Sequence, residues 1–304
     1  MQLAKTYNVG SYYPLFVLTN ANGDVIFRWT GYTGAKRFIA SINQALTDLT
    51  TVKQRKDRFH ANPNTRDGLS LASYSKGIGE FLNAIQYYQQ IEKLSGRDYS
   101  MQIFESSANA VWGDLLPFDS AISRANVILN AKVRNNRNIE KVARLMGNIA
   151  RKLNKTDRIE KYIRAGLKVT TGSKEVKTIN AHSSFLADSA LYLAADTTSA
   201  IRLGKLSLGE GWSTKPGKYY SFGLWCFQRR INLVEAESFV RRALALTEPG
   251  FFRAKHHDLL AELAFTLGRP GEALAQAELA LLEQPVSEFY EKQVKRFREA
   301  VGKR

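Results

Sequence analysis

Residues 254–285 carry two apolar stripes at helical spacing, separated by a break at Gly268 and Pro270. Apolar side chains recur every three or four residues before the break, and the same spacing resumes after it. Most residues that would face each other across the turn are alanines, which lets two helix axes approach closely. The pattern predicts a helical hairpin, and it constrains the fold more than any other stretch. The stripes comprise Leu259, Leu260, Leu263 and Leu267, then Ala273, Leu274, Ala277 and Leu281.

The position of Ala273 recurs along the chain at a nearly constant interval. The equivalent residues are Ala84, Ala121, Ile159, Ala200 and Ala236, at gaps of 37, 38, 41, 36 and 37 residues. This period predicts six helical hairpins and a final capping helix at about 286–301. A helical domain without repeats is the alternative. The predicted hairpins span residues 66–98, 102–135, 139–173, 180–214, 217–250 and 254–285.

The hairpins resemble the tetratricopeptide repeat. The first copy places Gly79 at the turn, then Phe81, Ala84 and Tyr88, where that family has an aromatic, a small and an aromatic residue. Copies two and four match more loosely. The resemblance implies a mainly α solenoid that acts as a non-enzymatic scaffold and binds protein partners in its concave groove.

The N-terminal segment follows a different pattern. Two β-prone runs, Leu15–Thr19 and Val25–Trp29, are separated by five turn-forming residues, and a helix is expected over about 34–49. The segment resembles the C-terminal half of a thioredoxin fold, which implies a cis peptide bond before Pro14. We therefore expect a partial thioredoxin-like unit at residues 1–55, a linker at 56–65 and the repeat domain at 66–304. The matched residues are Val9, Gly10, Pro14, Gly23 and Gly31.

The half of the thioredoxin fold that carries the CxxC motif is missing, and Cys226 is the only cysteine. Cys226 lies in an apolar run, where a buried thiol without redox chemistry is expected. The first strand also lacks a neighbour, so its apolar edge needs a cover. The first repeat helices, a second copy of the chain in a homodimer, or an upstream segment could provide that cover. An upstream CxxC would favour a second function, the C-terminal part of a thiol oxidoreductase with a tetratricopeptide tail.

The chain of 304 residues has a net charge of +16 and a pI near 9.8, which favours acidic partners. No membrane-spanning run and no signal peptide is visible, so the chain as written is expected in the cytoplasm. A missing N-terminus with a signal peptide would instead place it in the periplasm.

Over half of the excess charge falls in the third hairpin, where residues 132–168 hold twelve Lys and Arg against three Asp and Glu. Helical spacing puts the candidate contacts on one polar face. Arg144 and Asn148 resemble half of the family's carboxylate clamp, but His182 and Leu186 stand where the other half needs cations. We therefore predict binding of an acidic protein or peptide segment. The predicted contact residues are Lys141, Arg144, Asn148, Arg151 and Lys152.

Nucleic acid is the competing partner, because clustered cations neutralise phosphates. Tyr162 is the only aromatic residue between Lys132 and Lys168, which disfavours base stacking. His256 and His257 are adjacent on a helix, point about 100° apart and are expected at the surface. The sequence predicts no catalytic residue, no metal site and no cofactor.

Overall fold

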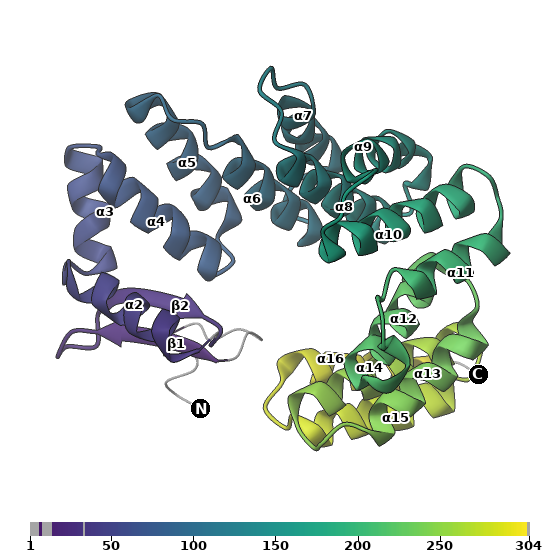
Figure 1. Cartoon of the computed structure of the whole chain (residues 1–304). Coiled ribbons are helices and arrows are strands. Elements are labelled where there is room, and N and C mark those ends of the chain that lie inside the picture. The colour runs from purple at the N-terminus through teal and green to yellow at the C-terminus, as the bar shows by residue number, and fades with distance from the viewer. Residues whose placement is uncertain (1–5, 8–13, 33, 303–304) are drawn as a thin grey trace. The chain divides into compact units, whose positions relative to one another are not determined.

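The computed structural model describes residues 6–7, 14–32 and 34–302. They fall into two compact units, which divide between residues 134 and 135 (Figure 1). The first unit contains a β-hairpin, two further helices and the first two helical hairpins. Its elements are β1 (Leu15–Thr19), β2 (Val25–Thr30), α2 (Ala35–Leu46), α3 (Val52–Ala61), α4 (Thr65–Gly77), α5 (Phe81–Ser95), α6 (Ser100–Trp112) and α7 (Phe118–Leu129).

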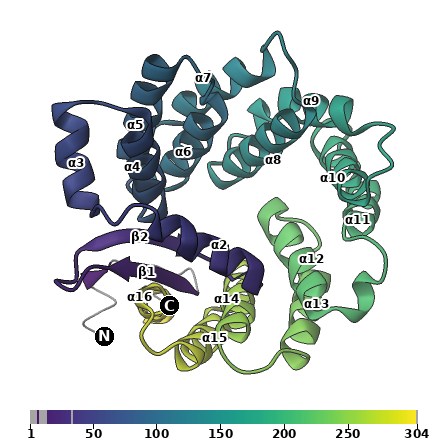
Figure 2. The same cartoon turned by 60° about the vertical axis from the view of Figure 1, so that its left-hand side comes forward.

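The second unit contains the other four helical hairpins and a last helix. The first helix of each hairpin lines the inner side of this unit's curve, and the second helix lies on the outer side (Figure 2). The mainly α fold with stacked hairpins is thus confirmed. The elements are α8 (Asn136–Lys152), α9 (Glu160–Thr170), α10 (Val176–Tyr192), α11 (Thr197–Leu206), α12 (Pro216–Arg229), α13 (Leu233–Ala245), α14 (Phe251–Thr266), α15 (Pro270–Glu283) and α16 (Glu288–Gly302), with short 3-10 turns at Thr156–Arg158 and Trp212–Thr214.

Helix boundaries follow local signals in the sequence. Asn64 and Asn135 cap α4 and α8 by accepting hydrogen bonds from backbone N–H groups three residues later. Pro216 and Pro270 occupy the first turn of α12 and α15, where a missing N–H costs nothing. Gly96 ends α5 in the left-handed conformation, with φ of 67°. These helix ends are therefore set by local residues before tertiary packing is considered.

The periodic position is buried in every copy, but the third copy is displaced by one helical turn. Ala84, Ala121, Ala200, Ala236 and Ala273 are each the fourth residue of the second helix of their hairpin, and each has no exposed surface. Ile159 instead precedes α9, whose fourth residue is Ile163. A long α8 and the 3-10 turn at Thr156–Arg158 account for the shift. Copies two and four, which match the family pattern loosely, keep the common register.

The N-terminal strands and helix form where the sequence predicts them, although β2 ends one residue later than predicted and α2 ends at Leu46 rather than near residue 49. β1 and β2 pair antiparallel, with Phe16 opposite Trp29 and an irregularity at Leu18/Thr19. The Asn20 side chain organises the turn by accepting hydrogen bonds from the backbone N–H groups of residues 22 and 24. Phe38 of α2 packs against Phe16 and Trp29, with ring centroids 4.9 and 5.9 Å away. One hairpin and one helix occur in many folds, so the thioredoxin-like assignment stays a prediction. Tyr13, and with it the Tyr13–Pro14 bond, lies outside the described residues.

α3 covers residues 56–61 of the predicted linker at 56–65, together with the last four residues of the predicted N-terminal unit. The capping box of Thr51 and Gln54 starts this helix, and Asn62 ends it. α3 and α4 both pack against β2. Within the described chain β1 has β2 as its sole strand neighbour, so the cover predicted for the other edge of β1 remains a prediction.

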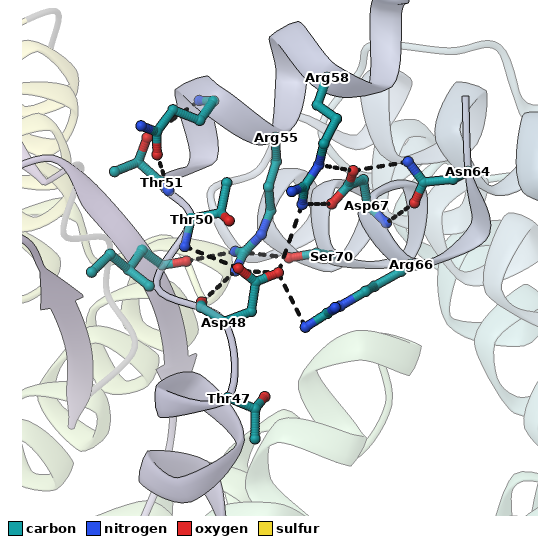
Figure 3. Close-up of polar contacts among 12 residues, drawn as sticks. Thr47, Asp48, Thr50, Thr51, Arg55, Arg58, Asn64, Arg66, Asp67 and Ser70 are labelled. Atoms are coloured by element: carbon teal, nitrogen blue, oxygen red, sulfur yellow. Dashed lines mark hydrogen bonds and ion pairs between the residues drawn. The ribbon is translucent and has the colours of Figure 1, made fainter. Parts of the chain in front are cut away.

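An arginine cluster joins β2, the loop between α2 and α3, α3 and α4 (Figure 3). Arg55 is only 5% exposed and donates hydrogen bonds to the carbonyl oxygens of Ile26 and Asp48, both at 2.8 Å. Arg58 donates two hydrogen bonds of 2.6 Å to the Asp67 carboxylate, which hold the pKa of Asp67 below its usual value. The Arg66 guanidinium lies 3.3 Å from the Asp48 carboxylate. These contacts fix the β-hairpin to the first repeat.

Cys226 has no exposed surface, and burial raises the pKa of its thiol to about 12. A thiol in that state is a poor nucleophile, in agreement with the packing role expected from its apolar neighbours. No described helix combines the length and apolarity needed to cross a bilayer.

Candidate functional site

The second unit contains a pocket of about 220 Å³ between the first helices of three successive hairpins. α8, α10 and α12 each contribute side chains, and α8 and α12 supply five lining residues each. The polar face of α8 is turned toward this pocket, because Val142, Met146 and Ile149 occupy the opposite, buried face. The lining residues are Ala143, Arg144, Gly147, Asn148, Arg151, Ile159, Ile163, Ala181, Ser184, Phe185, Asp188, Ser221, Leu224, Trp225, Gln228 and Arg229.

A buried ion triad forms part of the pocket wall. Asp188 of α10 accepts from Arg151 of α8 at 3.0 Å on one carboxylate oxygen. Its other oxygen receives Nε and Nη2 of Arg229 of α12, at 2.8 and 2.6 Å. The three side chains are between 3 and 7% exposed. One carboxylate therefore ties three consecutive hairpins together.

The pocket wall carries an excess of positive charge. Arg144, Arg151 and Arg229 contribute three guanidinium groups against the single carboxylate of Asp188, which leaves two positive charges. Burial lowers the pKa of Arg229, and the adjacent Asp188 opposes that shift. Arg144 is 54% exposed and lies 3.6 Å from Glu140, one helical turn earlier. The field at the pocket therefore favours an anion.

Two buried donors in the pocket wall have no acceptor among the described residues. They are Nε of Arg151 and Nε1 of Trp225. The other Arg151 nitrogens are engaged, because Nη1 meets Asp188 and Nη2 donates to the Asn148 side chain at 2.6 Å. A buried donor without a partner costs about 1–3 kcal/mol, so two such groups in one pocket are a marked exception to normal packing.

The five predicted contact residues do not all reach this pocket. Arg144, Asn148 and Arg151 line it, whereas Lys141 and Lys152 are not among its lining residues. Arg151 is 9% exposed and serves the triad rather than an open surface. Nothing in the structure tests whether any of the five binds a partner. His182 and Leu186 supply no cation, and the His182 ring lies 2.9 Å from the Thr170 hydroxyl, which links α10 to α9.

Asp188, Trp225 and Arg229 belong to the site but were not singled out from the sequence. Trp225 also stacks on Phe222, as a residue of the repeat core would. A signal for the charged pair does exist, because Asp188 follows Arg151 by 37 residues and Arg229 follows Asp188 by 41. Opposite charges one repeat apart on first helices are candidates for contacts between adjacent hairpins.

The two adjacent histidines are buried, and the expectation that they lie at the surface is wrong. His256 is 4% exposed and packs against the Tyr220 ring at 5.0 Å, and burial lowers its pKa to about 4. His257 is 5% exposed, with Nδ1 2.9 Å from the Gln276 amide oxygen. α14 is sandwiched between neighbouring helices, so polar residues on it are enclosed as well. Within the described residues, no group of three or more His, Cys, Asp or Glu is placed to hold a metal ion.

A second pocket, of about 330 Å³, adjoins the arginine cluster of the first unit. Its buried cation, Arg55, already binds two backbone carbonyls, the Ser70 hydroxyl and Asp48. The charge of Arg55 is therefore satisfied by partners within the first unit and does not require a ligand. The pocket in the second unit is the stronger candidate.

The comparisons with known proteins concern the fold. No protein-family model and no curated protein sequence matches this chain. A tetratricopeptide repeat protein from Parabacteroides merdae aligns over 86% of this chain and 96% of its own, with 14% identity and a TM-score of 0.55. The fold is tetratricopeptide-like.

Two further solved structures align with lower TM-scores. The Cut9–Hcn1 hetero-tetramer of the APC/C aligns over 80% of this chain and 44% of that chain, with 13% identity and a TM-score of 0.45. A thermophilic tetratricopeptide repeat protein from Thermus thermophilus aligns over 78% of this chain and 99% of its own, with 17% identity and a TM-score of 0.40.

Proposed function

We propose that this protein is an interaction scaffold that binds an acidic protein segment along the first helices α8, α10 and α12. The observation that carries the proposal is the pocket on that face, whose wall holds three guanidinium groups and one carboxylate. The repeat fold supports a binding role, because stacked hairpins present extended surfaces made of first helices. The net charge of +16 supports an acidic partner.

The contacts available on this face suit carboxylates. Arg144 offers an exposed guanidinium, which can pair with a carboxylate through two parallel hydrogen bonds. Asn148 is half-buried and its side-chain oxygen already accepts from Arg151, so its amide nitrogen remains the group that faces a ligand. Lys141 and Lys152 extend the positive face of α8 beyond the pocket and raise the rate of encounter with an acidic chain.

Charge reversal on α8 tests the proposal against a control on the outer helix of the same hairpin. Arg144→Glu changes the pocket face, whereas Arg164→Glu makes the same change on α9, where Arg164 is 68% exposed and is not a lining residue. Labelled peptides of about 12 residues rich in Asp and Glu would be titrated by fluorescence anisotropy, beside peptides with the same residues amidated.

Arg144→Glu should weaken binding of the acidic peptides by roughly tenfold or more, and Arg164→Glu by much less, because a contact at the site outweighs a screened surface charge. Equal losses in both variants would indicate only a general charge effect and refute the proposed site. Tighter binding of a single-stranded oligonucleotide than of every acidic peptide, with a steep dependence on salt, would instead favour nucleic acid as the partner.

A further inference from the structure

The two unpartnered donors in the pocket between α8, α10 and α12 point to a missing acceptor. Arg151 Nε and Trp225 Nε1 are both buried, both side chains are at most 9% exposed, and both residues line the pocket. Native proteins rarely leave such N–H groups without an acceptor, and a bound ligand is one way in which they become satisfied. An acceptor supplied from outside would therefore gain two hydrogen bonds that the protein itself does not make.

The neighbouring carboxylate does not supply that acceptor. Both oxygens of Asp188 are already engaged, one by Arg151 Nη1 and the other by Arg229. Asp188 compensates only one of the two arginines that it contacts, and Arg144 is paired with Glu140 at 3.6 Å. One positive charge therefore remains uncompensated in the wall, so a negatively charged acceptor is favoured over a neutral one. A carboxylate presents two acceptor oxygens, which matches the two open N–H groups in number.

The rest of the wall fits the stem of an acidic side chain. Ile159, Ile163, Phe185 and Leu224 give the pocket an apolar side, against which one or two methylene groups can pack. The volume of about 220 Å³ has room for such a side chain. Asp188 in the same wall disfavours a doubly charged group such as phosphate.

We propose that this pocket seats one Asp or Glu side chain of the bound segment, with its carboxylate accepting from Arg151 and Trp225. This inference rests on the proposed function and adds the residue at which the acidic segment is anchored. The two nitrogens have almost no exposed surface without a ligand, so binding of the carboxylate requires side chains of the pocket wall to move. Arg144 and Gln228 are the long, exposed side chains among the lining residues.

The indole N–H signals of the four tryptophans provide a direct test. In a ¹H–¹⁵N spectrum of the full chain, N-acetyl-L-glutamate should move the Trp225 signal downfield, and N-acetyl-L-glutamine at the same concentration should not. Trp225→Phe removes the donor but keeps a ring, so it should weaken binding of the acidic peptides about tenfold, as expected for a hydrogen bond to a charged group. Trp212→Phe, also in the second unit but outside the pocket, should leave binding unchanged.

Thermal stability provides a check on the variant. Trp225 stacks on Phe222, so the smaller ring in Trp225→Phe should lower the thermal midpoint, and the peptide titration is therefore run well below that midpoint. A loss of affinity of about tenfold that persists there is the result expected for the missing indole N–H. Should the variant fail to fold, the wild-type Trp225 signal is still identified by elimination, with phenylalanine variants of the other three tryptophans.

The outcomes separate this inference from the proposed function. Peptide binding that leaves the Trp225 signal and the Trp225→Phe affinity unchanged overturns the anchor and leaves the scaffold intact. A Trp225 shift with N-acetyl-L-glutamate in a protein that binds no acidic peptide supports the pocket and refutes the scaffold. Inorganic phosphate that moves the signal at lower concentration than N-acetyl-L-glutamate overturns the choice of a carboxylate.

Discussion

Replacing Asp188 by asparagine removes the negative charge that Arg151 and Arg229 share. Three short contacts, of 2.6, 2.8 and 3.0 Å, end on this carboxylate, and both arginine side chains are at most 5% exposed. Without the charge, two guanidinium groups face each other in a dry environment. Removing one member of a buried ion pair costs about 3–5 kcal/mol. Asparagine keeps one acceptor oxygen, so we expect a loss of about 3 kcal/mol in the unfolding free energy of the second unit.

The assay must separate the second unit from the first. Urea unfolding followed by hydrogen exchange and mass spectrometry reports peptides from residues 135–304 and 1–134 independently. Asp157→Asn, an exposed site in the same unit, removes the same charge and should change stability by no more than about 0.5 kcal/mol.

A second comparison distinguishes buried charge from lost packing. Replacing the whole triad, with Asp188→Leu, Arg151→Met and Arg229→Met, leaves no buried ion at this place, and such replacements are often neutral or stabilising. The triple variant should therefore be more stable than Asp188→Leu alone. A loss below about 1 kcal/mol for Asp188→Asn, or a triple variant no more stable than the single one, would refute this reasoning.

Two more predictions concern packing in the second unit. The pKa of His256 is lowered to about 4 against an ordinary value of 6.5, so the unfolded chain binds more protons between these values and stability should fall as pH drops through that window, by at most about 3 kcal/mol. The pKa of Asp258 is raised to about 6, so its protonation stabilises the folded state as pH drops and opposes the His256 effect. The His256 effect is therefore measured as the difference in unfolding free energy between wild type and His256→Phe, by urea unfolding at about pH 7 and about pH 4.5. Gly166→Ala should destabilise by about 1–3 kcal/mol, because its Cβ would lie 2.5 Å from the Phe185 ring, whereas Gly271→Ala meets nothing within 4 Å and should be neutral or slightly stabilising by thermal unfolding. Equal midpoints for the two alanine variants would contradict the second prediction.

The sequence was sufficient for the hairpins because their signals are local. Turn glycines, capping asparagines and a buried alanine near the start of most second helices are readable without tertiary structure. The register of the third hairpin was predicted wrongly because Ile159 and Ile163 are both apolar, both buried and one helical turn apart. The repeat period in the sequence cannot tell which of the two residues occupies the recurring buried position. The 3-10 turn before α9 places Ile163 there.

The pocket was only partly predictable, for a different reason. Helical spacing correctly grouped Arg144, Asn148 and Arg151 on one face of α8, but spacing within a helix carries no information on what the next hairpins bring to that face. Asp188 lies 37 residues after Arg151, and Arg229 lies 41 residues after Asp188. These two residues come from the next two hairpins, and their contacts bury Arg151, which helical spacing alone places on an exposed face. The predicted exposure of His256 and His257 was wrong for the same reason, because the helices that bury α14 precede and follow it in the chain.

The Arg151–Asp188–Arg229 triad changes how the stack is expected to unfold. In most repeat arrays each hairpin touches only its immediate neighbours, so the array can fray from its ends one hairpin at a time. Here α12 also contacts α8, two hairpins away, and a shared carboxylate sits between them. Hairpins three to five are thereby coupled into a single cooperative block, and fraying from the C-terminal end should stop at α12.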